Sequence, residues 1–166
     1  TGFEQMAAHR NTGLRALCEV GGIKKAPTPM DAGFVLGPRI NAGSRVHQAD
    51  LGARLLSCDD YEEAKNLAWT LNDCNAKRKT IQADMMREAS EMIELRGLHE
   101  RPLIMVADES WHVGLNGLVA GQIKEKYGKR ACCIAFAPGL SGMMEGRGSG
   151  RSIHGFNMAA LFMAAK

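Results

Sequence analysis

The chain has 166 residues, of which 45% are hydrophobic and 23% are charged. These proportions are close to those of ordinary globular domains, so they exclude a disordered tail, a collagen-like fibre and a simple repeat array. Lysine and arginine total 21 against 18 for aspartate and glutamate, which gives a formal net charge of +3. So small an excess does not by itself indicate nucleic-acid binding, and any anion site must come from a local cluster of basic residues.

The sequence also predicts a cytoplasmic location. No apolar run approaches the roughly 20 residues of a membrane-spanning helix, and the N-terminal segment lacks the apolar core of a signal peptide. The five cysteines show no C-x-x-C spacing, which suits reduced thiols. Because the chain begins with Thr1 rather than methionine, we expect it to be a piece of a longer protein.

The first part of the chain is predicted to be helical. Apolar residues at helical spacing indicate a short helix ending at Val20, before Gly21-Gly22. Thr28-Pro29-Met30-Asp31 combines a capping residue, a proline suited to the first turn and an acidic residue near N3. This pattern predicts a second helix over 29–36, which Gly37-Pro38 should end or kink.

A basic segment, 39–47, comes next, and a third helix is predicted over 49–56. Asp59-Asp60-Tyr61-Glu62 then resembles a helix start. An apolar stripe follows, and neither proline nor glycine interrupts it before Gly97. We therefore predict a single helix of about 35 residues, on the order of 50 Å long, that links two bodies. The stripe is expected to consist of two rows of residues: Ala64, Leu71, Arg78, Met85 and Met92, and Leu67, Cys74 and Ile81.

After Gly97 the pattern changes to strand, helix, strand. Buried strands are predicted over 103–107 and 131–136, with a helix over 113–127 between them, which together indicate a right-handed parallel βαβ unit. A glycine-rich segment follows, and an apolar helix over 156–165 ends the chain. The predicted fold class is therefore α/β, with a helical segment over 1–58, a long connecting helix over 59–97 and a small α/β domain over 98–166.

The glycine-rich segment 146–152 is the strongest candidate anion site. It reads Gly-Arg-Gly-Ser-Gly-Arg-Ser, and its glycines would let backbone amides approach an anion closely. Ser149 and Ser152 add hydroxyl donors, and Arg151 adds a planar fork suited to phosphate oxygens. It is not a Walker loop, because no lysine follows Gly150. A flexible hairpin turn is the alternative.

Two further clusters carry polar side chains. Arg39, Arg45 and His47 form either a solvated loop or, with the loop that carries Arg151, opposite walls of a groove for a polyanion. Asp108-Glu109-Ser110-Trp111-His112 lies where a strand ends and a helix begins, which is the usual ligand edge of an α/β sheet. This second cluster could supply a metal site, an acid–base pair or a stacking tryptophan. The favoured interpretation is a helix cap with the tryptophan packed beneath it.

Four stretches of the sequence carry a resemblance when they are taken together. They are His9-Arg10 through Leu17, Gly33-Phe34-Val35-Leu36-Gly37-Pro38-Arg39-Ile40-Asn41-Ala42, Trp111-His112-Val113-Gly114 and Gly148-Ser149-Gly150-Arg151-Ser152. These stretches resemble the RecJ-type single-stranded-DNA-specific exonucleases of the DHH phosphoesterase superfamily. Their order and spacing agree with that family over nearly the whole chain.

The resemblance implies a metal-dependent hydrolase that removes nucleotides from a 5′ end, with two lobes joined by a long helix. In the family, the first lobe carries aspartates and an Asp-His-His motif that bind two Mn²⁺ or Mg²⁺ ions, and these motifs do not occur here. The chain resembles the end of that lobe, the connector and most of the DHH-associated domain that grips DNA. No catalytic residue and no bound metal are therefore expected in this segment, which alone should be inactive.

The resemblance also assigns roles to individual residues. Ser149 and Arg151 match the serine and arginine that grip the 5′-terminal phosphate, within a motif that includes Gly148, Gly150 and Ser152. Arg39 and Arg45 match a loop that faces the DNA path, although Ala42-Gly43-Ser44-Arg45 departs from the family's Ala-Ala-Gly-Arg. His112 matches the family's tryptophan–histidine motif, with Val113 in place of the usual proline.

The expected partners are single-stranded DNA and DNA-repair proteins, with no membrane contact and a monomeric state. The sequence leaves two other functions open. One is a related phosphoesterase for short oligonucleotides or cyclic dinucleotides, and the other is a non-catalytic nucleic-acid-binding module.

Overall fold

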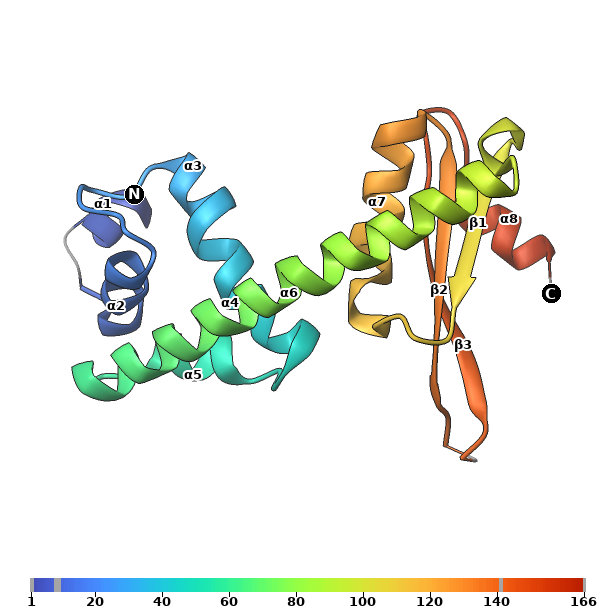
Figure 1. The fold of residues 1–166 in the computed structure, drawn as a ribbon. Helices are drawn as coiled ribbons and strands as arrows, with labels where there is room; N and C mark the ends of the chain where they lie inside the picture. Colours follow the sequence, from blue (N-terminus) through green and yellow to red (C-terminus); the bar gives the residue numbers. More distant parts are fainter. Residues whose placement is uncertain (1, 8–9, 141, 166) are drawn as a thin grey trace. The chain divides into compact units, whose positions relative to one another are not determined.

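In a computed structural model, which describes residues 2–7, 10–140 and 142–165, the chain forms two compact units, Thr1–Lys79 and Thr80–Lys166. The first, unit 1, is helical, and the second, unit 2, contains a three-stranded sheet. Helix α6 (Tyr61–Leu95) contributes residues to both units, which are described separately below (Figure 1). No helix in the described part of the chain is both long enough and apolar enough to cross a bilayer.

Unit 1 packs its helices around a leucine-rich core. Leu17, Leu36, Leu55 and Leu71, from four different elements, are almost completely buried within it. Asn11 caps the second helix by accepting a hydrogen bond from the Leu14 amide at 2.8 Å. The elements of unit 1 before α6 are α1 (Gly2–Ala7), α2 (Thr12–Val20), α3 (Pro29–Asp31), the π-helical η1 (Ala32–Leu36), α4 (Gly37–Val46) and α5 (Leu51–Ser57).

The predicted helix start at Thr28 is confirmed. Thr28 and Asp31 form a capping box: the Asp31 amide donates to Thr28 Oγ1 at 3.2 Å, and the Thr28 amide donates to Asp31 Oδ2 at 2.9 Å. Hydrogen bonds from the Thr28 side chain and backbone lower the pKa of the Asp31 carboxyl. Asp31 therefore stays ionised and keeps this cap through the neutral range.

Pro38 does not end the helix, contrary to one of the two outcomes expected for Gly37-Pro38. The five residues Ala32–Leu36 form a π-helical turn, and α4 follows without a break. A proline inside an α-helix leaves one carbonyl without its donor and crowds it, and a widened turn before the proline relieves both problems. The segment that carries Arg39 and Arg45 is consequently a helix rather than the expected loop.

The long helix is confirmed, but its buried stripe differs from the predicted heptad. In unit 1 the buried positions of α6 include Ala64, Leu67 and Leu71, as expected. In unit 2 they are Met85, Ala89 and Ile93, so that Ile93 is buried where Met92 was expected. A straight α-helix repeats every 3.6 residues and drifts out of phase with a seven-residue step, so the stripe shifts over this length.

Unit 2 contains the predicted parallel βαβ unit. Strands β1 (Leu103–Asp108) and β2 (Arg130–Pro138) pair in parallel, and α7 (Asn116–Tyr127), preceded by the 3₁₀ turn η3 (Val113–Leu115), connects them. Strand β3 (Met144–Arg151) pairs antiparallel with β2, which gives the order β1-β2-β3. The remaining elements are η2 (Leu98–Glu100) and α8 (Met158–Ala164), which lies within the helix predicted over 156–165 (Figure 1).

We predict that Gly13→Ala destabilises unit 1. A Cβ at Gly13 would lie 1.8 Å from the Leu55 carbonyl oxygen, so α2 and α5 would have to separate. Overpacking of this kind costs about 1–3 kcal/mol or more, which should lower the melting temperature measured by circular dichroism. Gly33→Ala is the control, because a Cβ there meets nothing within 4 Å. Equal melting temperatures for the two variants would contradict the close packing of α2 on α5.

Candidate anion-binding site

The candidate motif at 146–152 lies mostly in a β-strand, which corrects the expectation of a glycine-lined loop. Successive side chains of a strand point to opposite faces of the sheet, so the Gly-x-Gly-x-Gly pattern divides into two sets. In β3 the three glycines share one face, and Arg147, Ser149 and Arg151 share the other.

The glycine face provides room for packing. A Cβ on Gly148 would lie 3.2 Å from the Ile134 side chain, and one on Gly150 would lie 2.8 Å from the Phe162 ring. Strand β2 and helix α8 therefore approach β3 closely on this side. The glycines at these positions serve packing of the sheet, and the candidate anion ligands are the side chains on the opposite face.

On that opposite face, Ser149 and Arg151 meet the first turn of α7. The Arg151 guanidinium donates through Nη1 to Ser149 Oγ at 3.0 Å and to the Gly150 carbonyl at 2.9 Å. A Cβ on Gly117 would lie 2.5 Å from Arg151 Nη2 and 3.1 Å from Ser149 Oγ, so only glycine leaves the guanidinium in this place. We call Ser149, Arg151 and Gly117 the clasp.

The clasp has the electrostatics of an anion site. Arg151 is exposed, and no carboxylate in the described part of the chain forms an ion pair with it. It lies beside the positive end of the α7 dipole, whose first turn has no acidic residue. A guanidinium fork, a hydroxyl and a helix N-terminus together suit the oxygens of a phosphate group.

A buried asparagine holds the clasp together. Asn116, only 2% exposed, donates through Nδ2 to the Arg147 carbonyl at 2.6 Å, and so links α7 to β3. Its Oδ1 accepts from Cys133 Sγ at 3.5 Å. Burial, with a smaller contribution from Cys132, raises the pKa of Cys133 to about 12, so the thiol keeps the proton that this contact needs.

Ser152, the last residue of the predicted motif, is engaged elsewhere. It follows β3, and its hydroxyl donates to the Phe156 carbonyl at 2.7 Å, in the turn that leads to α8. The structure thus brings Ser149 and Arg151 together but leaves Ser152 outside the clasp.

The cluster at Asp108–His112 forms a structured turn. Trp111 is 4% exposed, and its indole N–H donates to Glu88 on α6 at 2.8 Å, so it packs in the core and offers no stacking surface. His112 caps η3 by accepting at Nδ1 from the Gly114 amide. Hydrogen bonds from the Ser110 side chain and backbone lower the pKa of Asp108. No group of three metal-ligating side chains occurs among the residues that the structure describes.

Arg39 is held within unit 1 by other residues. Its Nε donates to Asn72 Oδ1 on α6 at 3.1 Å, and its Nη1 donates to the Val35 carbonyl at 2.8 Å. The side chain is half-buried and connects α4 to α6. Arg39 therefore has a packing role within unit 1.

Arg45 lies close to a second arginine that the sequence analysis did not single out. Burial, and then the positive charge of Arg45, lower the pKa of Arg78 on α6. Asn75 Oδ1 accepts from Arg78 Nε at 3.2 Å and from Nη2 at 2.9 Å. In the sequence, the only indication of a special role for Arg78 was that a positively charged residue occurs within the predicted apolar stripe. His47, at the end of α4, is exposed.

Comparison with known proteins gives a consistent result. No family model matches the chain. The chain is 39% identical to the single-stranded-DNA-specific exonuclease RecJ of Dickeya dadantii over 150 residues, and 37% identical to that of Escherichia coli over 150 residues. Each alignment covers 88% of this chain and 25% of the relative. The chain thus spans about a quarter of the length of these relatives.

Solved structures agree with the sequence relatives. The crystal structure of RecJ in complex with Mn²⁺ from Thermus thermophilus matches 99% of this chain and 23% of its own, with a TM-score of 0.82 and 28% identity. A second structure, of exonuclease RecJ bound to manganese, matches 98% of this chain and 38% of its own, with a TM-score of 0.76 and 30% identity. The likeness therefore includes both units. Arg10 to Leu17 of the first matching stretch are described here, and His9 lies outside the described residues.

We predict that Asn116→Ala destabilises unit 2. The substitution leaves the Arg147 carbonyl without its buried donor, which should cost about 1–3 kcal/mol. Urea unfolding measures this loss, and hydrogen exchange at the β3 amides should become faster. Asn66→Ala, at an exposed position of α6, is the matched control. It should change neither the free energy of unfolding nor the exchange rates of the β3 amides. Unchanged exchange in β3 would show that Asn116 does not hold the strand.

Proposed function

We propose, from the premise that this chain belongs to the RecJ type of single-stranded-DNA-specific exonuclease, that it supplies the part of such an enzyme that grips the DNA strand. The intact enzyme would remove nucleotides in the 5′-to-3′ direction. The observation that carries the proposal is the clasp, in which Arg151 and Ser149 meet at the start of α7.

The clasp suits a terminal phosphate better than a phosphodiester. A terminal phosphate carries close to two negative charges and three oxygens that accept hydrogen bonds, whereas a backbone phosphodiester carries one charge. The Arg151 fork, the Ser149 hydroxyl and the helix dipole can all act on that group. Only one end of a 5′-phosphorylated strand carries it, so capture of this group would set the polarity of digestion.

Unit 1 would contribute contacts with DNA that do not depend on the base sequence. Arg45 on α4 and Arg78 on α6 place two positive charges near each other, which favours the approach of an anion. Backbone phosphates of a single strand are suitable anions, and such contacts position the strand without reading its bases. Arg39 and His112, which match family motifs near the DNA path, would contact the strand and also hold α4 and the β1–α7 turn in place.

The metal chemistry of the proposed enzyme is not assigned to this chain. Related RecJ structures from Thermus thermophilus are in complex with Mn²⁺ or Mg²⁺. The residues that the structure describes here offer no cluster of three ligating side chains, so they do not fit a divalent metal centre. Metal ions in the intact enzyme would activate water and stabilise the leaving oxygen, and this chain would place the strand.

The same proposal includes the location, the oligomeric state and the partners of the protein. All five cysteines are free thiols, which suits a reducing cytoplasm. We expect a monomer whose main partner is single-stranded DNA, with DNA-repair proteins as further partners.

We predict that the chain binds a 5′-phosphorylated oligonucleotide more tightly than its 5′-hydroxyl counterpart. Arg151→Ala should remove most of this difference, because a charge-assisted hydrogen bond contributes about 1.5–3 kcal/mol, or roughly 10- to 100-fold in affinity. Fluorescence anisotropy at low salt measures both affinities.

The matched control is Arg147→Ala on the same face of β3. Arg147 is exposed, its Nη2 lies 3.9 Å from Glu145 Oε2, and Asn116 of α7 donates to its backbone carbonyl. The control should preserve the preference for phosphate. If wild type binds the two oligonucleotides equally, the assignment of the clasp fails.

We also predict that this chain alone does not digest single-stranded DNA. It should show no release of nucleotides with Mn²⁺ or Mg²⁺, because the described residues provide no metal centre. Release of nucleotides from a fluorescent oligonucleotide, compared with a chelator control, tests this. Metal-dependent digestion by the purified chain would refute the proposal that this chain positions the strand without holding the metal ions.

A further inference from the structure

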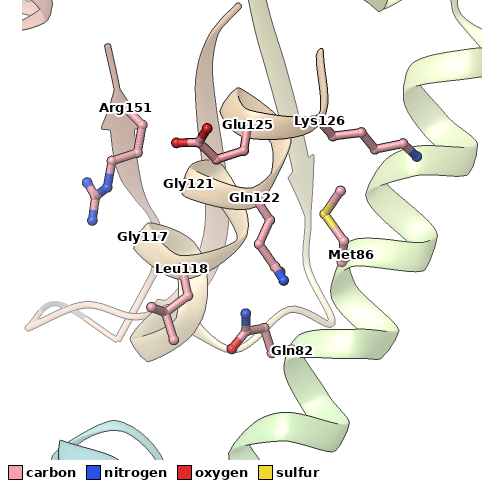
Figure 2. A pocket seen from close by; sticks show the side chains of 9 residues that line it. All are labelled: Gln82, Met86, Gly117, Leu118, Gly121, Gln122, Glu125, Lys126 and Arg151. Atoms are coloured by element: carbon pink, nitrogen blue, oxygen red, sulfur yellow. The ribbon is translucent and has the colours of Figure 1, made fainter. Parts of the chain in front are cut away.

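A pocket of about 780 Å³ extends from the clasp along one side of α7 to α6, within unit 2 (Figure 2). Arg151 stands at one end of it. The proposed contacts with the phosphate use only the end of the pocket next to Arg151. The pocket is lined by Gln82, Met86, Gly117, Leu118, Gly121, Gln122, Glu125, Lys126 and Arg151.

On one side of the pocket, next to the clasp, the helix backbone is bare at Gly121. Gly117 and Gly121 are one turn apart and so lie on the same face of α7. A Cβ added at Gly121 would meet nothing within 4 Å, so the space in front of it is open. A flat group can therefore lie directly against the helix, starting next to the Arg151 guanidinium.

The walls combine carboxamides with apolar side chains. Gln82 on α6 and Gln122 on α7 both extend into the pocket, and their carboxamide ends approach one another (Figure 2). Each carboxamide offers a donor and an acceptor, which is the pair of groups that a nucleobase edge requires. Met86 and Leu118 add apolar surface that can contact a ring face.

The charges differ between the two ends. Arg151 provides a positive end at the clasp. Further along α7, Glu125 is paired with Lys124, and Lys126 donates through Nζ to Ser90 Oγ at 3.0 Å and lies over the Tyr127 ring. An anion is thus favoured beside Arg151, and an uncharged group is favoured further along α7.

We propose that this pocket receives the base of the nucleotide whose 5′-phosphate the clasp holds. The inference rests on the proposed function and deepens it, because it assigns a base subsite to Gln82, Gln122 and the glycine face of α7. Rotation of a carboxamide exchanges its donor and acceptor, so the same two side chains can accept any of the four bases. The subsite would add affinity for a nucleotide without selecting a sequence.

The test is a nuclear magnetic resonance titration of the full 166-residue chain with three probes. Thymidine 5′-monophosphate carries phosphate, sugar and base, deoxyribose 5-phosphate lacks the base, and thymidine lacks the phosphate. The side-chain NH₂ signals of Gln82 and Gln122 and the backbone signal of Gly121 report on the pocket. The backbone signals of Ser149 and Arg151 report on the clasp.

We expect thymidine 5′-monophosphate to shift both sets of signals and deoxyribose 5-phosphate to shift only the clasp set. The nucleotide should bind about fivefold more tightly than the sugar phosphate, as expected when the base adds one or two neutral hydrogen bonds. Equal affinities with the same set of shifted signals would overturn the base subsite and leave the phosphate grip intact. If thymidine shifts the pocket signals while neither phosphate probe shifts the clasp, the subsite survives and the proposed phosphate grip fails. No response to any probe would overturn both.

A substitution that fills the pocket gives an independent check. Gly121→Leu places a side chain in open space and replaces a helix-interior glycine, so it should fold at least as well as wild type. Its affinity for thymidine 5′-monophosphate should fall to that measured for deoxyribose 5-phosphate. Asp84→Leu, at an exposed position of α6 outside the pocket lining, is the matched control and should bind as wild type does. An unchanged affinity in Gly121→Leu would place the base elsewhere.

Discussion

The hydrogen bond from Asn116 to the Arg147 carbonyl fixes the first turn of α7 against β3, and the candidate site depends on that junction. Because Asn116 is buried, the bond is partly shielded from competing water, and its loss would leave the Arg147 carbonyl without this donor. With the turn held in place, Gly117 comes opposite Arg151, and the absence of a side chain leaves room for the guanidinium. A rigid contact between a helix and a strand thus sets the position of an otherwise flexible arginine.

The same strand serves packing and binding because its sequence alternates. Gly148 and Gly150 let β2 and α8 approach on one face, while Ser149 and Arg151 extend from the other. A one-residue shift of register would exchange the two faces and bury the charged side chains. The glycines that suggest a phosphate loop therefore act indirectly, by anchoring the strand that presents the ligands.

Unit 1 uses arginines in two different ways. Arg39 donates to Asn72 and to a backbone carbonyl, so two of its donors hold α4 against α6. Arg45 and Arg78 instead place like charges near each other, where burial and repulsion both lower the pKa of Arg78.

Local signals in the sequence determined much of this fold. The capping box at Thr28, the uninterrupted helix Tyr61–Leu95 and the parallel βαβ unit all follow from short-range spacing, because helix starts and periodic stripes depend on neighbouring residues. Tertiary structure alone decided that the glycine-rich segment pairs with β2 as a strand, and that a π-helical turn carries the chain past Pro38. It also brought Arg78 to Arg45 and Gly117 to Arg151, pairs separated by more than thirty residues. Such contacts arise from packing between elements, and no local pattern of residues specifies them.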